Sequence, residues 1–361
     1  MTSTGMAKGI TGKVGITIGL DVSDRFTEAY AIDSEGTWIA SWRMPTKQAA
    51  LRDGLARHSG ARVVLEVGCH SPWISRQLRQ ESFEVIVANP RRVRLIAESD
   101  KKSDRFDAEQ LARLGRIDPG LLSPIVHRGE QAQRDRVLLL ARDGLVQSRT
   151  RLINQVRGFA KSLGSRVPSS SSEAFPKRVR DAVGDDLFPG LGAMLRMIEQ
   201  LTEEIRSMDQ QVERFGKDRY EETELLRQIP GVGPLTALAF VLTLEDPHRF
   251  AKSRDVGAYL GLRPRQRDSG GQRPQLRITK AGDAMVRRLL VTAAHYVLGP
   301  FGPDTDLRRF GLHLAERGGK AAKKRAAVAV ARKLAVLLHR LWITGEAYQA
   351  LGYGRADEQA A

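Results

Sequence analysis

The chain has 361 residues, of which 41% are hydrophobic, and it carries a formal net charge of +16 and a single cysteine, Cys69. This hydrophobic content excludes a disordered chain, and a lone cysteine excludes a disulfide framework and a thiolate zinc site. We find neither an apolar run of membrane-spanning length nor a signal peptide, so we expect a cytoplasmic protein without a membrane partner. The positive charge favours a polyanionic partner, nucleic acid before an anionic membrane.

The first 90 residues predict a mixed sheet covered by helices. The expected elements are strands over 14–22, 28–32 and 38–44, a helix over 47–58, a strand over 61–68, a helix over 72–80 and a strand over 84–90. A DSEG turn separates the second strand from the third. Strands that first follow one another and then alternate with helices are typical of an α/β domain with a mixed sheet.

Four carboxylates in this region are candidates for a metal site. Asp21 and Glu66 interrupt strands that otherwise read as buried, where an ionised carboxylate is costly unless it is paired or binds a metal. Asp104 and Asp107 lie three residues apart near the start of a predicted helix and therefore share a face. Each acid alone has a structural explanation, such as capping of a helix N-terminus. Together, their oxygen ligands favour Mg²⁺ or Mn²⁺ and two-metal phosphoryl transfer.

Residues 118–128 read as a linker, and two helical stripes follow it. The first stripe consists of Leu138, Ala141, Leu145, Ser148, Leu152, Val156, Phe159 and Leu163. The second consists of Met194, Met197, Leu201, Ile205, Met208, Val212 and Phe215. Spacing that alternates between three and four residues is typical of a coiled coil. A Ser/Pro-rich insertion over 168–189 separates the stripes, and the two helices could form either an intramolecular hairpin or a dimerisation arm.

The sequence LLRQIPGVGPLTALAF, over residues 225–240, has the form of a helix, a PGVG turn and a second helix. In a helix-hairpin-helix, the turn amides around Gly231 and Gly233 would form a nest for a backbone phosphate. An ordinary corner between two helices explains the same pattern. A further helix is expected over 283–297.

The segment over residues 257–282 places one serine among glycines and cations. Ser269 precedes two glycines, and the flanking cations are Arg263, Arg265, Arg267, Arg273, Arg277 and Lys280. Guanidinium groups suit phosphate oxygens, and glycines let the backbone approach a ligand closely. Ser269 is therefore a candidate nucleophile toward a phosphodiester. The alternative is a basic surface loop whose serine caps a turn.

An amphipathic helix is predicted over residues 318–342. Its first turns contain the candidate nucleic-acid contacts Lys323, Lys324 and Arg325. A role at a membrane surface is less simple, because the apolar face can complete the core of the domain. Residues 351–361 are expected to form a disordered tail. The histidines show no metal-ligand spacing.

The motifs LDVS, LEVG and SDRFDAEQLARL, which contain Asp21, Glu66, Asp104 and Asp107, resemble the RuvC-like DEDD domain of the IS110-type insertion-sequence transposases. From IPGVGPLTA through LGLRPRQRDSGG to ITKAGD, the second half resembles the C-terminal transposase domain of that family. The helical arm between the two halves matches as well, so the resemblance covers nearly the whole chain.

The resemblance implies an RNase-H/RuvC-like domain over 1–125, a coiled-coil arm with the insertion over 126–222, and a mainly helical serine transposase domain over 223–350. It implies that the four acids bind Mg²⁺ or Mn²⁺ and that Ser269 forms a covalent phosphoserine link with DNA. It also implies a bridge RNA that pairs with donor and target DNA. Assembly in that family proceeds from dimers to a tetramer whose active sites combine domains of different protomers.

Two other functions stay open from the residues alone. A metal-dependent junction nuclease would use the acids to activate water and would leave Ser269 a structural role. A non-catalytic basic protein would bind DNA through the hairpin and the C-terminal helix. The chain has no G-x-x-x-x-G-K-[ST] segment, which agrees with strand exchange that conserves bond energy and needs no ATP.

Overall fold

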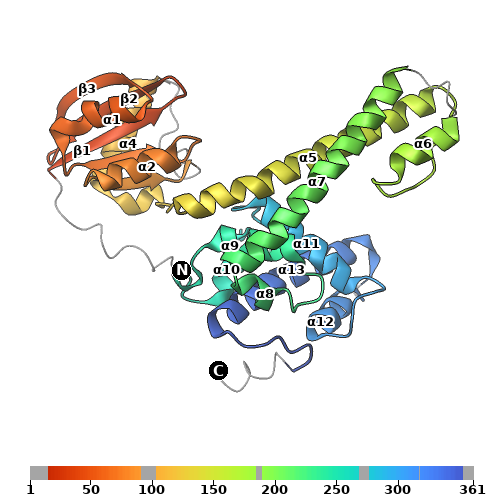
Figure 1. Cartoon of the computed structure of the whole chain (residues 1–361). Helices are drawn as coiled ribbons and strands as arrows, with labels where there is room; N and C mark the ends of the chain where they lie inside the picture. Colours follow the sequence, from red (N-terminus) through yellow and green to blue (C-terminus); the bar gives the residue numbers. More distant parts are fainter. Residues whose placement is uncertain (1–14, 91–102, 184–188, 268–275, 317, 353–361) are drawn as a thin grey trace. The chain divides into compact units, whose positions relative to one another are not determined.

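A computed structural model of the chain describes residues 15–90, 103–183, 189–267, 276–316 and 318–352. The chain divides into two compact units, Met1–Arg128 and Gly129–Ala361 (Figure 1). Among the helices of the described ranges, none is long and apolar enough to cross a membrane. The predicted tail lies largely outside these ranges, since the description ends at residue 352.

The first unit is built on a five-stranded sheet with the order β3-β2-β1-β4-β5. Its strands are β1 (Ile16–Val22), β2 (Phe26–Asp33), β3 (Trp38–Pro45), β4 (Arg62–Glu66) and β5 (Glu84–Ala88). β1 pairs antiparallel with β2 and β2 antiparallel with β3, whereas β4 runs parallel to both β1 and β5. The predicted mixed sheet is therefore confirmed.

Helices cover both faces of the sheet, because successive side chains of a strand point to opposite faces. They are α1 (Gln48–Leu55), α2 (Ser71–Gln80) and α4 (Asp104–Ile117). Ile18 and Leu20 of β1 pack in one core with Leu51 of α1 and Ile74 of α2. On the opposite face, residues of β2, β4 and β5 pack with apolar side chains of α4. The result is a three-layer α/β/α arrangement.

Two glycines bring α4 close to the centre of the sheet. A Cβ atom on Gly19 of β1 would lie 1.9 Å from the carbonyl oxygen of Ala108, and one on Gly115 of α4 would lie 2.3 Å from Cγ2 of Val64. Both distances are far inside van der Waals contact, so neither position accepts a larger residue without a shift of the helix. This contact determines where the first turn of α4 lies relative to β1.

The prediction of a linker over 118–128 is wrong for its first part. Residues Pro119–Leu122 form a 3₁₀ turn, and Leu122 is fully buried. Ile125 forms an antiparallel bridge with Val87, and Asn89 N–H donates to the Leu122 carbonyl at 2.9 Å. The segment packs on the edge of the sheet because Leu122 and Ile125 bury apolar surface there, despite the neighbouring prolines and glycine.

The second unit is helical. Its described helices are α5 (Glu130–Ser162), α6 (Phe175–Val183), α7 (Pro189–Arg219), α8 (Glu222–Leu226), α9 (Pro234–Leu244), α10 (Ser253–Tyr259), α11 (Ala284–Leu298), α12 (Asp306–Ala315) and α13 (Gly319–Thr344). Figure 1 shows α5 and α7 as a long pair that extends from the remaining helices. In α9 every residue from Thr236 to Leu244 is buried, which places this helix at the centre of the main core.

The predicted stripe of α5 is displaced from the observed contact face, whereas that of α7 departs from it chiefly at Met197. Predicted members such as Phe159, Leu163 and Met197 are about half exposed, at 51%, 54% and 48%. The buried residues of α5 are Ala132, Asp135, Leu139, Ile153, Val156 and Ala160, and those of α7 include Leu195, Ile198, Thr202, Ile205 and Val212. These positions keep the spacing of three and four residues, so the predicted period was correct. The predicted face was largely wrong for α5, where Val156 is the shared buried residue, and largely correct for α7, where Ile205 and Val212 are buried.

Charged residues hide the true contact face of α5 from a hydrophobicity pattern. Arg142 lies between Leu139 and Ile153 in sequence and pairs with Asp209 of α7. Arg149 donates to the hydroxyl of Thr202 at 3.2 Å. Because polar residues at these positions find partners on α7, they are tolerated where the pattern leads one to expect apolar side chains.

The Ser/Pro-rich insertion contains a helix that the sequence pattern did not predict. α6 covers Phe175–Val183, and Phe175 and Val179 are fully buried in a core with residues of α5 and α7. Their spacing of four residues is the signal that identifies the helix. The insertion therefore packs against the far part of the helical pair and is not only a spacer.

Candidate functional site

The register of the sheet places two of the predicted acids side by side. Gly19 of β1 faces α4, and because side chains alternate, Asp21 lies on the same face. Leu20 pairs with Leu65 across β1 and β4, so Asp21 and Glu66 are neighbours at the ends of two parallel strands. Val64, two residues before Glu66, also faces α4. Both carboxylates thus belong to the α4 side of the sheet.

The first turn of α4 supplies the other two acids. Ser103 caps the helix, and its hydroxyl accepts from the Phe106 N–H at 3.2 Å. Asp104 and Asp107 lie in this first turn, within one turn of Ala108, whose carbonyl lies against Gly19. The close approach of α4 to β1 therefore brings both aspartates toward the end of β1.

Electrostatics show that the four carboxylates act on one another. The pKa of Asp21 is raised from 3.8 to about 6, first by burial and then by the negative charges of Asp104, Asp107 and Glu66, in that order. A carboxyl whose pKa is raised by several like charges lies where a cation would be bound favourably. The structure thus brings together all four acids that the sequence predicts.

The donor set fits a hard divalent cation. All four groups offer carboxylate oxygens, which Mg²⁺ and Mn²⁺ prefer, and there is no thiol or imidazole among them. Among the described residues, no three acidic, histidine or cysteine side chains converge on one point closely enough to hold an ion as they stand. Mutual repulsion separates like charges, so binding of a cation requires side-chain rotations that bring the oxygens together.

A fifth carboxylate was missed by sequence reasoning. Glu28 of β2 pairs directly with Asp21 of β1 and is the smallest of the effects that raise the Asp21 pKa. Its own charge is partly balanced by Arg43 of β3, 3.4 Å away. The signal was available, because the turn between the two strands sets the register that places Glu28 opposite Asp21.

The segment around Ser269 is held at its base by a short ladder. Arg265 N–H donates to the Arg277 carbonyl at 3.0 Å, and Thr279 N–H donates to the Arg263 carbonyl at 2.9 Å. Pro264 and Ile278 form the bridge between them. Ser269 and Arg273 lie outside the described residues, as does the Gly-Gly pair. The structure therefore defines the two arms that lead to the serine, but not the serine itself.

Two glycines make this base compact. Gly261 has φ +71° and Gly282 has φ +67°, in the left-handed region that other residues adopt at a cost. A Cβ on Gly261 would meet the Ala281 carbonyl oxygen at 2.2 Å, and one on Gly282 would meet the Tyr259 carbonyl oxygen at 2.0 Å. The backbone segments that enter and leave the serine segment thus pack directly against each other.

The predicted cations around this base are open to solvent. Arg263, Arg265, Arg267, Arg277 and Lys280 are all exposed, and Arg263 donates to the Gln266 amide oxygen at 2.8 Å. The first turns of α13 hold the exposed pair Lys323 and Lys324, followed by Arg325. These exposed cations can reach a phosphate backbone without any change of the fold.

The PGVG turn connects α8 to α9. Gly231 has φ +87°, and Gly233 is the N-cap of α9 with open space around its α-carbon. A Cβ on Gly231 would lie 3.0 Å from the Ala293 carbonyl oxygen, so the turn packs on α11. Phosphate binding by this turn stays a prediction.

Comparison with known proteins agrees with this arrangement. A DEDD transposase domain model of the IS110 type matches residues 18–163, and a model described as Transposase IS116/IS110/IS902 family matches residues 223–306. The chain is 29% identical over 344 residues to the transposase for insertion sequence element IS1111A of Coxiella burnetii. The aligned region spans 92% of this chain and 91% of that protein. It is 29% identical over 283 residues to the transposase for element IS1328 of Yersinia enterocolitica, covering 77% and 82%.

A DEDD-type domain implies the use of a divalent metal ion, and within the matched residues Asp104, Asp107 and Glu66 lie close enough to Asp21 to raise its pKa. In the sequence, the range matched by the first family model precedes α7 and contains the four acids, and the range matched by the second follows α7 and contains the base of the serine segment. The chain therefore belongs to the IS110 family of insertion-sequence transposases, as its motifs predict.

Proposed function

We propose that this transposase cuts and rejoins DNA by transesterification, with Asp21, Glu66, Asp104 and Asp107 as metal ligands and Ser269 as the nucleophile. The observation that carries the proposal is the raised pKa of Asp21, to about 6, caused by burial and by the other three acids. Carboxylates brought so close that they oppose one another's ionisation are stabilised by a cation. A bound Mg²⁺ or Mn²⁺ supplies charge stabilisation at a phosphoryl group.

In the proposed step, the Ser269 oxygen attacks the phosphorus of one phosphodiester. A Ser–O–P bond forms, the bond from phosphorus to one deoxyribose oxygen breaks, and that oxygen takes up the proton that the serine releases. The number of phosphodiester-type bonds is unchanged, so the reverse attack by a second DNA hydroxyl reseals the strand without ATP. Arg263, Arg265 and Arg273 would offset negative charge on the phosphoryl group in the transition state.

Other exposed groups suit the proposed DNA and RNA partners. Arg267, Arg277 and Lys280 flank the serine segment, Gly231 and Gly233 form the turn before α9, and Lys323, Lys324 and Arg325 lie at the start of α13. We assign these groups to phosphate contacts, which position a nucleic acid but do not read its sequence. Sequence choice would come from base pairing with a bridge RNA.

We further propose that dimers of the chain join into a tetramer. The resemblance to the family supports this assembly, as does the long pair α5 and α7, which extends from the core of its unit (Figure 1). The coiled-coil role of this pair and the helix-hairpin-helix role of the PGVG turn belong to the same proposal. Sedimentation of the full chain, alone and with element-end DNA, measures the assembly directly.

A denaturant-resistant adduct tests the chemical step. Purified protein is incubated with its noncoding RNA, Mg²⁺ and labelled element-end DNA, and the products are separated under denaturing conditions. We expect a protein–DNA adduct that Ser269→Ala abolishes and that Ser207→Ala, an exposed serine on α7, leaves unchanged. An adduct that persists in Ser269→Ala, or cleavage without an adduct, would show that the serine is not the nucleophile and would favour a junction nuclease.

The acidic site is tested separately. Asp104→Asn should abolish both cleavage and adduct formation, whereas Asp53→Asn, which removes an exposed carboxylate of α1, should not. Normal cleavage by Asp104→Asn would rule out the metal-site assignment. Failure of the wild-type protein to cleave under any of these conditions would favour an architectural DNA-binding role.

A further inference from the structure

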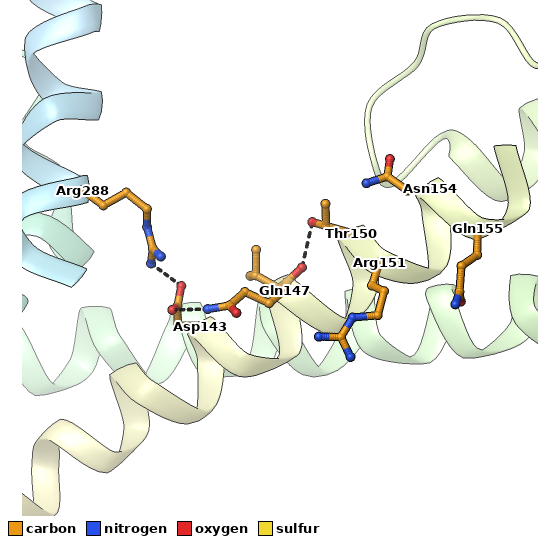
Figure 2. Close-up of a pocket in the computed structure, with 8 residues that line it drawn as sticks. Asp143, Gln147, Thr150, Arg151, Asn154, Gln155 and Arg288 are labelled. Carbon is orange, nitrogen blue, oxygen red and sulfur yellow. Dashed lines mark hydrogen bonds and ion pairs between the residues drawn. The ribbon is translucent and has the colours of Figure 1, made fainter. Parts of the chain in front are cut away.

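A polar groove runs along α5 in the second unit (Figure 2). Its volume is about 710 Å³. Seven of its eight lining residues are polar or charged, and they are Asp143, Gln147, Thr150, Arg151, Asn154, Gln155 and, from α11, Arg288; Val146 is the eighth. Neither the acidic site nor the serine segment includes any of these residues.

The lining residues form one face of the helix. Gln147, Arg151 and Asn154 follow one another at spacings of four and three, which places their side chains on one side of α5. The opposite side carries Ile153 and Val156, which are buried. Arg151, Asn154 and Gln155 are all exposed, and Figure 2 shows their side chains projecting from α5 beside Gln147. This face of α5 is therefore available to a partner.

The single acid of the groove is already neutralised. Asp143 forms an ion pair with Arg288 of α11 and accepts from the Gln147 amide at 2.7 Å. Beyond Asp143, α5 has no further acidic residue, but it carries Arg149, Arg151, Arg157 and Lys161. The lining itself, with Arg151 and Arg288 against Asp143, thus has a net positive charge that suits an anionic partner.

Three side chains of the groove have unused hydrogen-bonding capacity. Arg149 is engaged with Thr202 and Arg157 lies over the Phe175 ring, but Arg151 forms no hydrogen bond or ion pair with any described residue. The same holds, within the described ranges, for the amides of Asn154 and Gln155, and all three side chains are exposed. A guanidinium beside two amides provides donors for phosphate oxygens and matched donor–acceptor pairs for base edges.

The composition of the groove argues against other occupants. An apolar peptide or an amphipathic helix needs pockets between large apolar side chains, whereas apart from Val146 the apolar surface of this groove comes from the aliphatic parts of polar residues. A packed helix of a second copy would leave the Asn154 and Gln155 amides desolvated unless it supplied matching polar groups. A phosphodiester strand satisfies both the charge and the donors while leaving most of the face in water.

We propose that a nucleic-acid strand docks along the α5 groove, with Arg151 on a phosphate and with Asn154 and Gln155 on sugar or base edges. The inference rests on the proposed function, because it assumes that the chain handles DNA and its RNA. It adds a contact surface on the long helical pair, apart from the cations of the serine segment and of α13.

Binding of the full chain to labelled nucleic acid tests this site. Affinity for element-end DNA, and separately for the noncoding RNA, is measured between about 50 and 200 mM salt, where each phosphate contact contributes close to one unit of the log–log slope. Arg151→Gln should weaken binding about five-fold and lower the slope by about one. Gln155→Glu, which places a carboxylate in the groove, should weaken binding more strongly than Arg151→Gln does.

Matched variants on α7 serve as controls. Arg206→Gln removes an exposed arginine and Gln210→Glu adds a carboxylate at an exposed position of the partner helix. The inference is supported if the two groove variants lose affinity for DNA or for RNA and the two controls do not; the nucleic acid that is affected identifies the strand. It is overturned if groove and control variants bind alike.

Two further outcomes are distinguished in the same experiment. If Gln155→Glu changes the sedimentation of the protein without nucleic acid, the groove is a contact between copies and the inference is wrong. If the wild-type protein itself binds neither DNA nor RNA, the proposed function fails, irrespective of the groove. Normal adduct formation with loss of affinity in the groove variants alone would show that the two sites act separately.

Discussion

Replacement of Asp21 by asparagine should stabilise the metal-free protein while it abolishes DNA cleavage. The pKa of Asp21 is raised from 3.8 to about 6, so the folded state holds the proton of this carboxyl more tightly than the unfolded chain does. Above pH 6 the ionised Asp21 therefore opposes folding, and this penalty is absent at low pH, where both states are protonated.

The expected gain in the free energy of unfolding follows from this pKa difference of about two units, which corresponds to about 3 kcal/mol. Asp21 is only partly buried, so solvent screening reduces the expected gain of Asp21→Asn to about 1–2 kcal/mol at pH 7.5. The gain should shrink steadily between pH 6 and pH 4. Added Mg²⁺ should stabilise the wild-type protein but not the variant, because a ligand that binds only the folded state favours folding.

Urea unfolding in EDTA, followed by tryptophan fluorescence, measures this gain. Three of the four tryptophans, Trp38, Trp42 and Trp73, lie in the first unit, so a Trp342→Phe background reports on that unit alone. Asp53→Asn provides a control at an exposed carboxylate, with an expected change within about 0.5 kcal/mol. The reasoning is refuted if Asp21→Asn is less stable than the wild type in EDTA at pH 7.5, or if its gain is the same at acidic pH.

Three other substitutions test how the two units are built. Gly19→Ala should lower the stability of the first unit by about 1–3 kcal/mol and weaken Mg²⁺ binding in calorimetry, because the new Cβ would displace α4 at Ala108. Asp135→Ala should lower the free energy of unfolding of the second unit by about 2–3 kcal/mol in urea, since Tyr220 loses a hydrogen bond of 2.7 Å. Burial opposes ionisation of Asp135, but its hydrogen bonds lower its pKa. The wild-type protein therefore keeps this stabilisation above about pH 4 and loses it as the pH falls further. Gly261→Ala should reduce adduct formation while circular dichroism stays near that of the wild type, and an unchanged yield of adduct would show that the compact base is not needed.

Much of the first unit follows from sequence-local rules. Short apolar runs separated by turn and helix signals predict all five strands, and parallel neighbours end at the same edge of a sheet, which is enough to bring Asp21 and Glu66 together. Their spacing places Asp104 and Asp107 on one face of a predicted helix, and the family motifs group them with Asp21 and Glu66. The place of α4 against the sheet, however, depends on an absent side chain at Gly19, and pattern reasoning gave that glycine no role.

Tertiary structure alone decided which face of α5 meets α7. The helical spacing of apolar residues in α5 and α7 could be predicted from the sequence. Three charged residues, however, occupy the contact face of α5, and each has a partner on or near α7: Asp135, Arg142 and Arg149. A hydrophobicity pattern assigns such residues to solvent, because the penalty for burying a charge is removed only by a group distant in sequence. The same limit hid the polar groove of α5, whose residues individually read as an ordinary solvated face.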